Sequence, residues 1–468
     1  MINITIKAHR KYLLANTADP QKLFVMIKVI PGKEVAAVRP PVSIVLVVDT
    51  SGSMYSFADQ EKSTAMIQQR GLTGVPVSRG DDGATGYDLD LPSKLDQAIK
   101  ACKKFVQDAR LTTEDQLAVI NFDTDANTLL PLQPLTNRDS ATTAVDSLSE
   151  HSGDTWMAKG INLAREQVTR LPTSAAKRVI LFTDGATADE PECRQAAGSL
   201  AEINCPVAVV GLGDEYNAEL LSEIASISCG RVYPLEDIED FDATIQTELG
   251  SSIREVITDL RLNLSAVKGV SLNSIVRVFP SLAEMSAAGL PIKLGNIEKG
   301  DYTVFIAELT IQGLQRPPSE ARLARLLLSG EAPALGRTYE SPPQDVRVEF
   351  TPDQAAVQDQ KNDEEVMSYV QQRNVDSLTQ QAVTMAKRDP EGATRLLEQA
   401  QSITRRLGNS SVTRQLKAAA DELKSTGSLS GKTQRITSLG GRTKTVRKDG
   451  EGVSDLPSSD EIRRASGV

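Results

Sequence analysis

Short, uninterrupted runs of apolar residues mark the clearest strands in the chain. Residues 44–48 read Ile-Val-Leu-Val-Val, a run that is rich in β-branched side chains and too short for a long helix. Such a run is typical of a parallel strand that is covered on both faces. A second run of this kind occupies residues 179–183. Each run ends at an acid, Asp49 after the first and Asp184 after the second.

Strand-like and helix-like patterns alternate along residues 38–255. Amphipathic helical patterns occur at 94–109, 140–148, 156–171, 192–203, 218–226 and 241–255. Strand-like runs occur at 44–48, 116–122, 128–131, 179–183, 206–211 and 231–233. Regular alternation of this kind predicts an α/β fold, a doubly wound and mainly parallel sheet with helices on both faces.

The two flanks of this region carry a different strand pattern. Residues 256–350 contain short strands separated by turns, which is typical of a β-sandwich. Residues 1–37 contain two more strand patterns, at 3–8 and 22–30. Because two strands alone are not stable in water, we expect them to join the sandwich.

The last part of the chain is helical and then polar. Residues 353–425 carry apolar stripes at helical spacing, which predicts a helical hairpin or small bundle. Residues 426–468 are rich in Gly, Ser, Thr, Lys and Arg, so we expect a disordered tail. Its basic stretches contain Thr433 and Thr445. These threonines are either kinase sites that a phosphothreonine reader would bind, or part of a solvated tail.

Composition narrows the class of protein. The 468 residues suffice for two or three domains, and contents of 40% hydrophobic and 24% charged residues are ordinary for a soluble protein. The net charge of −10 argues against general nucleic-acid binding. No stretch resembles a signal peptide or a membrane span, so we expect a cytoplasmic protein. The four cysteines lack CxxC spacing, which predicts buried thiols rather than zinc ligands or disulfides.

Oxygen-bearing side chains cluster where the two apolar strands end. Ser51 and Ser53 follow Asp49 at alternate positions, and Asp184 ends the later strand. Thr155 precedes a helical pattern. In an open α/β sheet, ligands bind beyond the carboxyl ends of the strands. Carboxylate and hydroxyl oxygens suit Mg²⁺ rather than zinc, so the pattern indicates a magnesium site.

The order of these pieces resembles that of the von Willebrand factor type A (VWA) domain. The chain carries D-x-S-x-S, then Gly-Asp-Thr about a hundred residues later, then Thr-Asp-Gly. In the resembled family these motifs form a metal-ion-dependent adhesion site (MIDAS). The resemblance implies that Asp49, Ser51, Ser53, Thr155 and Asp184 coordinate Mg²⁺, or alternatively Mn²⁺ or Ca²⁺. One departure is Asp154, where the family more often has glycine.

The resemblance implies a bacterial, Mg²⁺-dependent protein–protein interaction module. In that family the metal binds an acidic side chain of a partner protein. One alternative is a VWA subunit of an ATP-driven, chelatase-like or AAA-ATPase-linked assembly, whose ATPase would be a separate chain. Another is a metal-dependent hydrolase, with Glu150, His151 and Asp154 as local candidates for a base. Because the chain has no recognised catalytic pattern, we expect that it is not an enzyme.

An insertion at residues 55–92 separates the first metal loop from the first long helix. It is rich in Gly, Asp and Gln and contains an Arg-Gly-Asp tripeptide at 79–81. We interpret the tripeptide as a chance occurrence. The insertion either shapes the partner surface beside the metal or is a decorative loop. Its acids would repel an acidic partner unless the metal offsets them; they are Asp59, Asp81, Asp82, Asp88 and Asp90.

Overall fold

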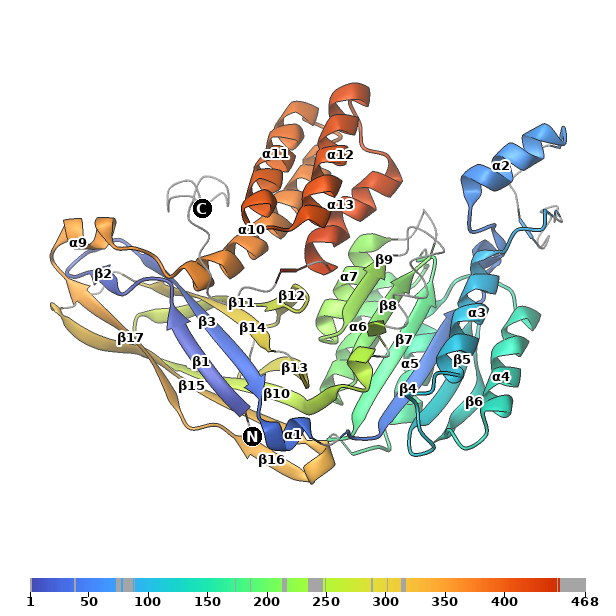
Figure 1. The fold of residues 1–468 in the computed structure, drawn as a ribbon, viewed down its shortest axis with the longest axis horizontal. Helices are drawn as coiled ribbons and strands as arrows, with labels where there is room; N and C mark the ends of the chain where they lie inside the picture. The colour runs from blue at the N-terminus through green and yellow to red at the C-terminus, as the bar shows by residue number, and fades with distance from the viewer. Residues whose placement is uncertain are drawn as a thin grey trace. The chain divides into compact units, whose positions relative to one another are not determined.

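The chain forms two compact units, each with a core of its own. In the computed structural model, Val38–Thr258 form one unit, and Met1–Ala37 together with Asp259–Val468 form the other (Figure 1). The structure describes residues 2–37, 39–72, 77–78, 87, 89–172, 174–185, 187–212, 217–234, 247–248, 250–287, 289–300, 302–312, 317–443 and 445–446. The chain therefore enters the second unit, leaves it for the first, and returns to it.

A six-stranded sheet forms the centre of the Val38–Thr258 unit. Its strand order is β6-β5-β4-β7-β8-β9, and all neighbours are parallel except β5 and β6. The strands are β4 (Val42–Asp49), β5 (Gln116–Phe122), β6 (Ala126–Pro134), β7 (Ala176–Thr183), β8 (Val207–Gly211) and β9 (Arg231–Pro234). Every residue of β4 and β7 is buried, as their apolar sequences predict for central strands.

Helices cover both faces of this sheet, because the side chains of β4 alternate between them. Ile44 and Leu46 belong to the core under α3 and α4, whereas Val47 faces α5. A Cβ at Gly160 of α5 would lie 3.0 Å from Val47 Cγ1, so glycine lets α5 approach β4 closely. The helices are α3 (Lys94–Val106), α4 (Arg138–Asp146), α5 (Met157–Val168), α6 (Glu190–Glu202) and α7 (Ala218–Ile227). Of the helix predicted at 241–255, residues 241–246 and 249 lie outside the described residues, residues 247–248 and 250–252 are helical, and Glu255 already begins β10.

The described part of the insertion is a small lobe with its own apolar cluster. The 3₁₀ turn η1 (Gly52–Tyr55) leads into it, and it contains helix α2 (Gln60–Gln69), which stands away from the sheet in Figure 1. Phe57, Ile67 and Leu89 are buried together. The described part of the insertion therefore has packing of its own. The tripeptide at 79–81, and with it Asp81, Asp82 and Asp88, lies outside the described residues.

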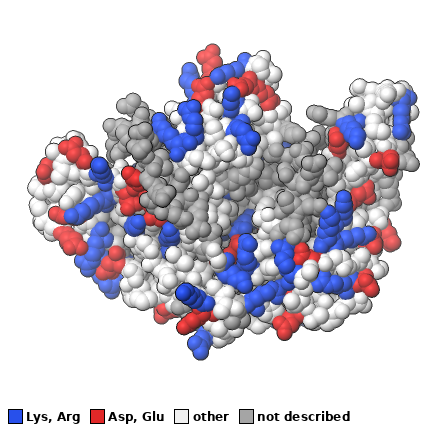
Figure 2. Space-filling view, in the orientation of Figure 1, with Lys and Arg blue, Asp and Glu red and all other residues white. Residues whose placement is uncertain are grey.

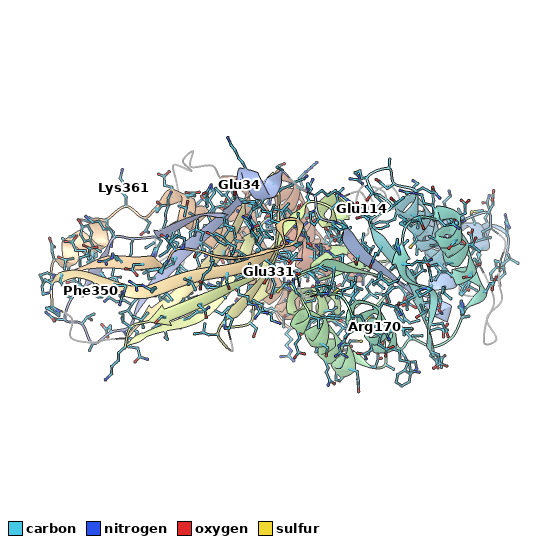
Figure 3. The ribbon with its side chains drawn as sticks, turned by 90° about the horizontal axis from the view of Figure 1, so that it is seen from below. Glu34, Glu114, Arg170, Glu331, Phe350 and Lys361 are labelled. Carbon is cyan, nitrogen blue, oxygen red and sulfur yellow. The ribbon has the colours of Figure 1, made fainter. Side chains whose placement is uncertain are left out.

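Two mainly antiparallel sheets form the body of the second unit. Their strand orders are β1-β3-β14-β11-β12 and β13-β10-β15-β17-β2, with β16 paired to β15. The N-terminal strand β3 pairs with β14 along nine residues, so the start of the chain lies in the same sheet as strands that follow residue 259. Figure 3 labels Glu331 on β15 and Phe350 on β17, two strands of the second sheet.

The strands of the second unit include the two predicted at 3–8 and 22–30, which are β1 and β3. Their bounds are β1 (Ile2–Ala8), β2 (Tyr12–Leu14), β3 (Gln21–Pro31), β10 (Glu255–Ala266), β11 (Val270–Phe279), β12 (Ala283–Met285), β13 (Ile292–Glu298), β14 (Thr303–Ile311), β15 (Ser319–Ala332), β16 (Arg337–Glu340) and β17 (Gln344–Thr351). A short helix, α1 (Lys33–Ala36), follows β3.

The helical segment contains one helix that the sequence did not predict. The helices of this segment are α9 (Gln354–Asp359), α10 (Glu364–Met385), α11 (Pro390–Arg406), α12 (Ser410–Thr426) and α13 (Gly431–Thr443), and α13 is the one that was not predicted. The prediction of disorder from residue 426 onward is therefore wrong for α13. Leu429 and Leu439 are buried, and Arg442 Nε donates to Asp376 Oδ1 of α10 at 2.8 Å. A few apolar side chains and one ion pair order this segment despite its polar composition. Residues 447–468 lie outside the described residues.

Candidate metal site

The register of the central sheet brings the two predicted acids to one edge. Val48 of β4 lies opposite Phe182 of β7, so both strands end together, at Asp49 and just before Asp184. Both acids are buried, with exposed fractions of 0% for Asp49 and 4% for Asp184. Neighbouring strands therefore place two carboxylates at the carboxyl end of the sheet, where α/β proteins bind ligands.

Hydrogen bonds connect the four predicted residues of these two loops. Asp49 Oδ1 accepts from the Ser51 backbone N–H at 2.9 Å, and its Oδ2 accepts from Thr183 Oγ1 at 2.7 Å. The hydroxyl oxygens of Ser51 and Ser53 lie 3.1 Å apart. Ser53 Oγ donates to Asp184 Oδ1 at 2.9 Å. The hydroxyl of Ser53 thus links the first loop to Asp184, and the hydroxyl of Ser51 lies beside it.

Backbone contacts hold the segment with Thr155 against both loops. Gly52 N–H donates to Gly153 O at 2.9 Å, and Thr155 O accepts from Ala188 N–H at 3.2 Å. A Cβ at Gly153 would lie 2.5 Å from Thr124 Oγ1, so this close approach requires glycine. The half-buried Thr155 therefore lies between the loops after β4 and β7. The side chain of Asp154 beside it is exposed.

A buried ammonium group bonds to one of the two acids. Lys94, which is 5% exposed at the start of α3, donates from Nζ to Asp184 Oδ2 at 2.9 Å. Burial, and then the negative charge of Asp184, raise the pKa of Asp49 to about 7. This role of Lys94 could not be predicted from sequence because the insertion separates it from the first metal loop. Its only local signal is the capping box formed by Ser93 and Asp96 at the start of α3.

A further layer of hydrogen bonds supports the loops and was not foreseen. Thr50 Oγ1 donates to Asp123 Oδ2 at 3.1 Å, and Asn121 Nδ2 donates to the same oxygen at 3.3 Å. Trp156 N–H donates to the backbone oxygen of Asp123 at 3.0 Å. These contacts join the ends of β4 and β5 to the start of α5. They fix the backbone from which the predicted ligands project.

The donor set fits a hard divalent cation. Two carboxylates and three hydroxyls are oxygen ligands throughout, as Mg²⁺, Mn²⁺ and Ca²⁺ prefer. Among the described residues, no group of three or more His, Cys, Asp and Glu side chains could hold a metal. A site for a soft or histidine-bound metal is thus not found in that part of the chain. The pair of buried carboxylates, of which Asp184 bonds to Lys94, is the feature that a dication would balance.

The two candidate phosphorylation sites make hydrogen bonds in the second unit. Thr433 Oγ1 donates to the carboxylate of Glu422, and Thr445 Oγ1 donates to Pro280 O at 2.6 Å. A phosphate on Thr433 would place its negative charges beside Glu422 and break this contact. Phosphorylation at either position, which stays a prediction, would therefore loosen the packing of the last helix.

The described surface has no large area of one charge on the face in Figure 2, where basic and acidic side chains are interspersed. Within the described ranges, no helix is both long and apolar enough to span a bilayer.

Comparisons by sequence identify two regions of the chain. Residues 91–248 match the von Willebrand factor type A domain, and residues 364–447 match the Sll0103-like, C-terminal alpha-helical domain. The first match includes Thr155 and Asp184 but begins after the loop with Asp49. An uncharacterized protein, sll0103, from Synechocystis sp. is 22% identical over 298 residues, which are 58% of this chain and 69% of that protein.

Two solved structures resemble nearly the whole chain. A von Willebrand factor type A protein from Catenulispora acidiphila has a TM-score of 0.73 at 18% identity and covers 95% of this chain and 97% of its own. The ArnB paralog VWA2 from Sulfolobus acidocaldarius has a TM-score of 0.56 at 14% identity and covers 96% of this chain and 100% of its own. At these identities the likeness shows the fold alone. Together with the family match, it shows that the chain contains a von Willebrand factor type A domain.

Proposed function

We propose that this protein is a Mg²⁺-dependent protein-interaction module, whose metal binds an acidic side chain of a partner protein. Asp49, Ser51, Ser53, Thr155 and Asp184 would hold the metal. The observation that carries the proposal is the pair of buried carboxylates at neighbouring strand ends, joined through the hydroxyls of Ser51 and Ser53. A buried pair of like charges is costly unless a cation offsets it.

The charges of the site favour an acidic partner. With Asp49 and Asp184 ionised and Lys94 protonated, the buried groups carry one net negative charge. A dication would reverse that sign, so the loaded site would attract a carboxylate. Five side chains also leave octahedral Mg²⁺ one ligand short of six, which a partner or water would supply. The metal, when bound, supplies positive charge, and the chain's residues orient it toward the loop surface.

Metal binding by the full-length chain tests this proposal directly. Trp156 is the only tryptophan of the chain, follows Thr155, and is 38% exposed, so its fluorescence should report metal at the loops. We expect a saturable change with Mg²⁺ that calorimetry reproduces. The matched control is Asp154→Ala, because this exposed acid is next to Thr155 and should leave Mg²⁺ affinity nearly unchanged. Equal Mg²⁺ affinity in wild type and Asp49→Ala would refute the site.

Partner binding is the second step of the test. The wild-type chain, immobilised and exposed to a bacterial lysate with Mg²⁺, should capture proteins that EDTA releases and renewed Mg²⁺ restores. The Asp49→Ala chain should not capture them. Capture that persists undiminished in EDTA would show that the partner uses another surface.

A further inference from the structure

The only tryptophan of the chain is exposed beside the candidate metal residue Thr155. Trp156 is 38% exposed and immediately precedes α5. Single exposed apolar side chains are ordinary on protein surfaces. In the part of the chain that the structure describes, the large ones are Leu72, Trp156, Ile227, Leu290 and Met385. Trp156 differs from the others because it alone follows a candidate metal residue, whose Cα is about 3.8 Å from its own.

The backbone of Trp156 is fixed by hydrogen bonds on both sides. Its N–H donates to Asp123 O at 3.0 Å, and its carbonyl accepts from Lys159 N–H at 3.2 Å. The next residue, Met157, is buried. A tryptophan side chain has only two rotatable bonds, so it loses little conformational freedom when a partner packs on it. Tryptophan is also enriched among the residues that contribute most to the affinity of protein interfaces.

The charged side chains near the ring limit what can pack on it. Lys159 Nζ lies 5.5 Å from the centroid of the Trp156 ring and pairs with Asp125 at 2.9 Å. An ammonium therefore already occupies the position of a cation at this ring, and a second cation there would be repelled. Asp154 is exposed and makes no ion pair among the described residues, so it would repel an acid. An uncharged apolar side chain is the neighbour that these charges favour.

We propose that Trp156 is a specificity-determining contact, which packs against an uncharged apolar residue next to the acidic residue of the partner. This inference rests on the proposed function, because the metal would fix the position of that acid. Neighbouring residues of the partner are also about 3.8 Å apart, so the acid and the residue beside it can reach Thr155 and Trp156 together. Partial burial of a leucine side chain on the ring should raise the affinity about tenfold.

Four matched peptides test this contact on the full-length chain. Their sequences are Ser-Leu-Glu-Leu-Ser, Ser-Gly-Glu-Gly-Ser, Ser-Arg-Glu-Arg-Ser and Ser-Leu-Gln-Leu-Ser, each with a dye at the N-terminus and an amide at the C-terminus. Fluorescence anisotropy with Mg²⁺ at physiological salt measures their affinities. We expect the Leu-Glu-Leu peptide to bind about tenfold more tightly than the Gly-Glu-Gly peptide and more tightly than the Arg-Glu-Arg peptide. The Leu-Gln-Leu peptide should show no binding that depends on Mg²⁺.

The emission of Trp156 reports the contact independently. Addition of the unlabelled Leu-Glu-Leu peptide to the Mg²⁺-loaded chain should shift this emission to shorter wavelength, because the ring leaves water. The Gly-Glu-Gly peptide should shift it less. Since Trp156 is the only tryptophan, the signal comes from this position alone.

Variants assign the preference to this side chain. Trp156→Ala should lower the affinity for the Leu-Glu-Leu peptide about tenfold and remove its advantage over the Gly-Glu-Gly peptide, whereas Trp156→Phe should retain most of that advantage. The control is Ile227→Ala, at a side chain that is also 38% exposed. Ile227 ends α7 just before β9, so it lies at the amino end of the strands, opposite the metal loops. This variant should leave the affinity within about twofold.

Calorimetry with Mg²⁺ alone keeps the two proposals apart. Absence of Mg²⁺ binding, or Mg²⁺ binding without binding of any glutamate peptide, would refute the proposed function and this inference with it. If Mg²⁺ and the Gly-Glu-Gly peptide bind but the Leu-Glu-Leu peptide binds no more tightly, only the role of Trp156 is refuted. A preference for leucine that survives in Trp156→Ala, or tightest binding of the Arg-Glu-Arg peptide, would also overturn that role.

Discussion

Two places in the molecule bury a pair of acids, and they are balanced in different ways. At the metal loops, Asp184 bonds to the ammonium of Lys94, and the negative charge of Asp184 acts on Asp49. In the second unit, Glu308 and Asp376 each have a guanidinium partner, Arg373 and Arg442 respectively (Glu308 also pairs with Lys22). The first pair is short of positive charge and the second pair is not.

One acid of each pair has a shifted pKa, and the two shifts run in opposite directions. Burial and the charge of Asp184 raise the pKa of Asp49 to about 7. Burial also raises the pKa of Glu308, but the hydrogen bond from Arg373 and the nearby cations outweigh it and hold that pKa below its ordinary value. Under the proposed function, the uncompensated pair would bind a dication, whereas the compensated pair would stabilise the fold. The following predictions are ordered from the largest expected effect to the smallest.

Removing one acid of the uncompensated pair should abolish metal binding without loss of stability. Asp49→Asn keeps the shape of the side chain and removes its repulsion with Asp184. We expect Mg²⁺ affinity to fall more than about 100-fold, since even groups behind the ligands cost about 10–100-fold. The unliganded variant should unfold at the same or higher urea concentration than wild type at pH 7. A clear loss of stability would show that Asp49 is structural.

Removing a cation of the compensated pair should have the opposite outcome. Arg442→Leu leaves Asp376 buried without its partner and loosens α13, so the free energy of unfolding should fall by about 2 kcal/mol. Urea unfolding measures this loss. The control is Arg325→Leu, which breaks an exposed pair with Asp345 and should cost less than about 1 kcal/mol. Equal effects of the two variants would argue against the docked helix.

Removing the cation of the metal loops should strengthen metal binding. Lys94→Met retains the apolar stem of this buried side chain and deletes a positive charge beside Asp184. We expect Mg²⁺ to bind about tenfold more tightly at low salt, because the ammonium no longer repels the dication. Calorimetry at two salt concentrations checks this, with Lys103→Met on the exposed side of α3 as control. Weaker binding in Lys94→Met would mean that the lysine positions Asp184 for the metal.

Acid should lower the free energy of unfolding of the second unit through the buried His9. Burial, and then the charge of Arg10, lower the pKa of His9 to about 3. The unfolded chain binds this proton near pH 6.5, so the stabilising contribution is complete above that pH and is lost as the pH falls toward 3. Wild type should lose roughly 1 kcal/mol per pH unit more than His9→Asn between pH 6 and 4. Parallel urea curves at both pH values would contradict this.

The sequence predicted those parts of the site that local pattern controls. Apolar runs that end in an acid identify central strands and their carboxyl ends, so Asp49 and Asp184 were found without a structure. Lys94 could not be found in this way. It reaches Asp184 only after the insertion folds back to the sheet, through contacts such as Lys94 N–H to Ser56 O at 3.0 Å.

The last helix shows why composition misleads about order. Residues 426–446 contain few apolar groups, which predicts disorder if each residue must supply its own core. In the fold, α10, α11 and α12 already form most of that core, which Leu429 completes, and Leu439 of α13 is buried as well. Arg442 and Val446 then bond to α10, at Asp376 and Gln372. Periodicity thus determined the strands, the long helices and the metal loops, because these depend on neighbours in sequence. Tertiary structure decided the charge balance of the buried acids and the order of α13, because burial and pairing depend on groups that the sequence places far apart.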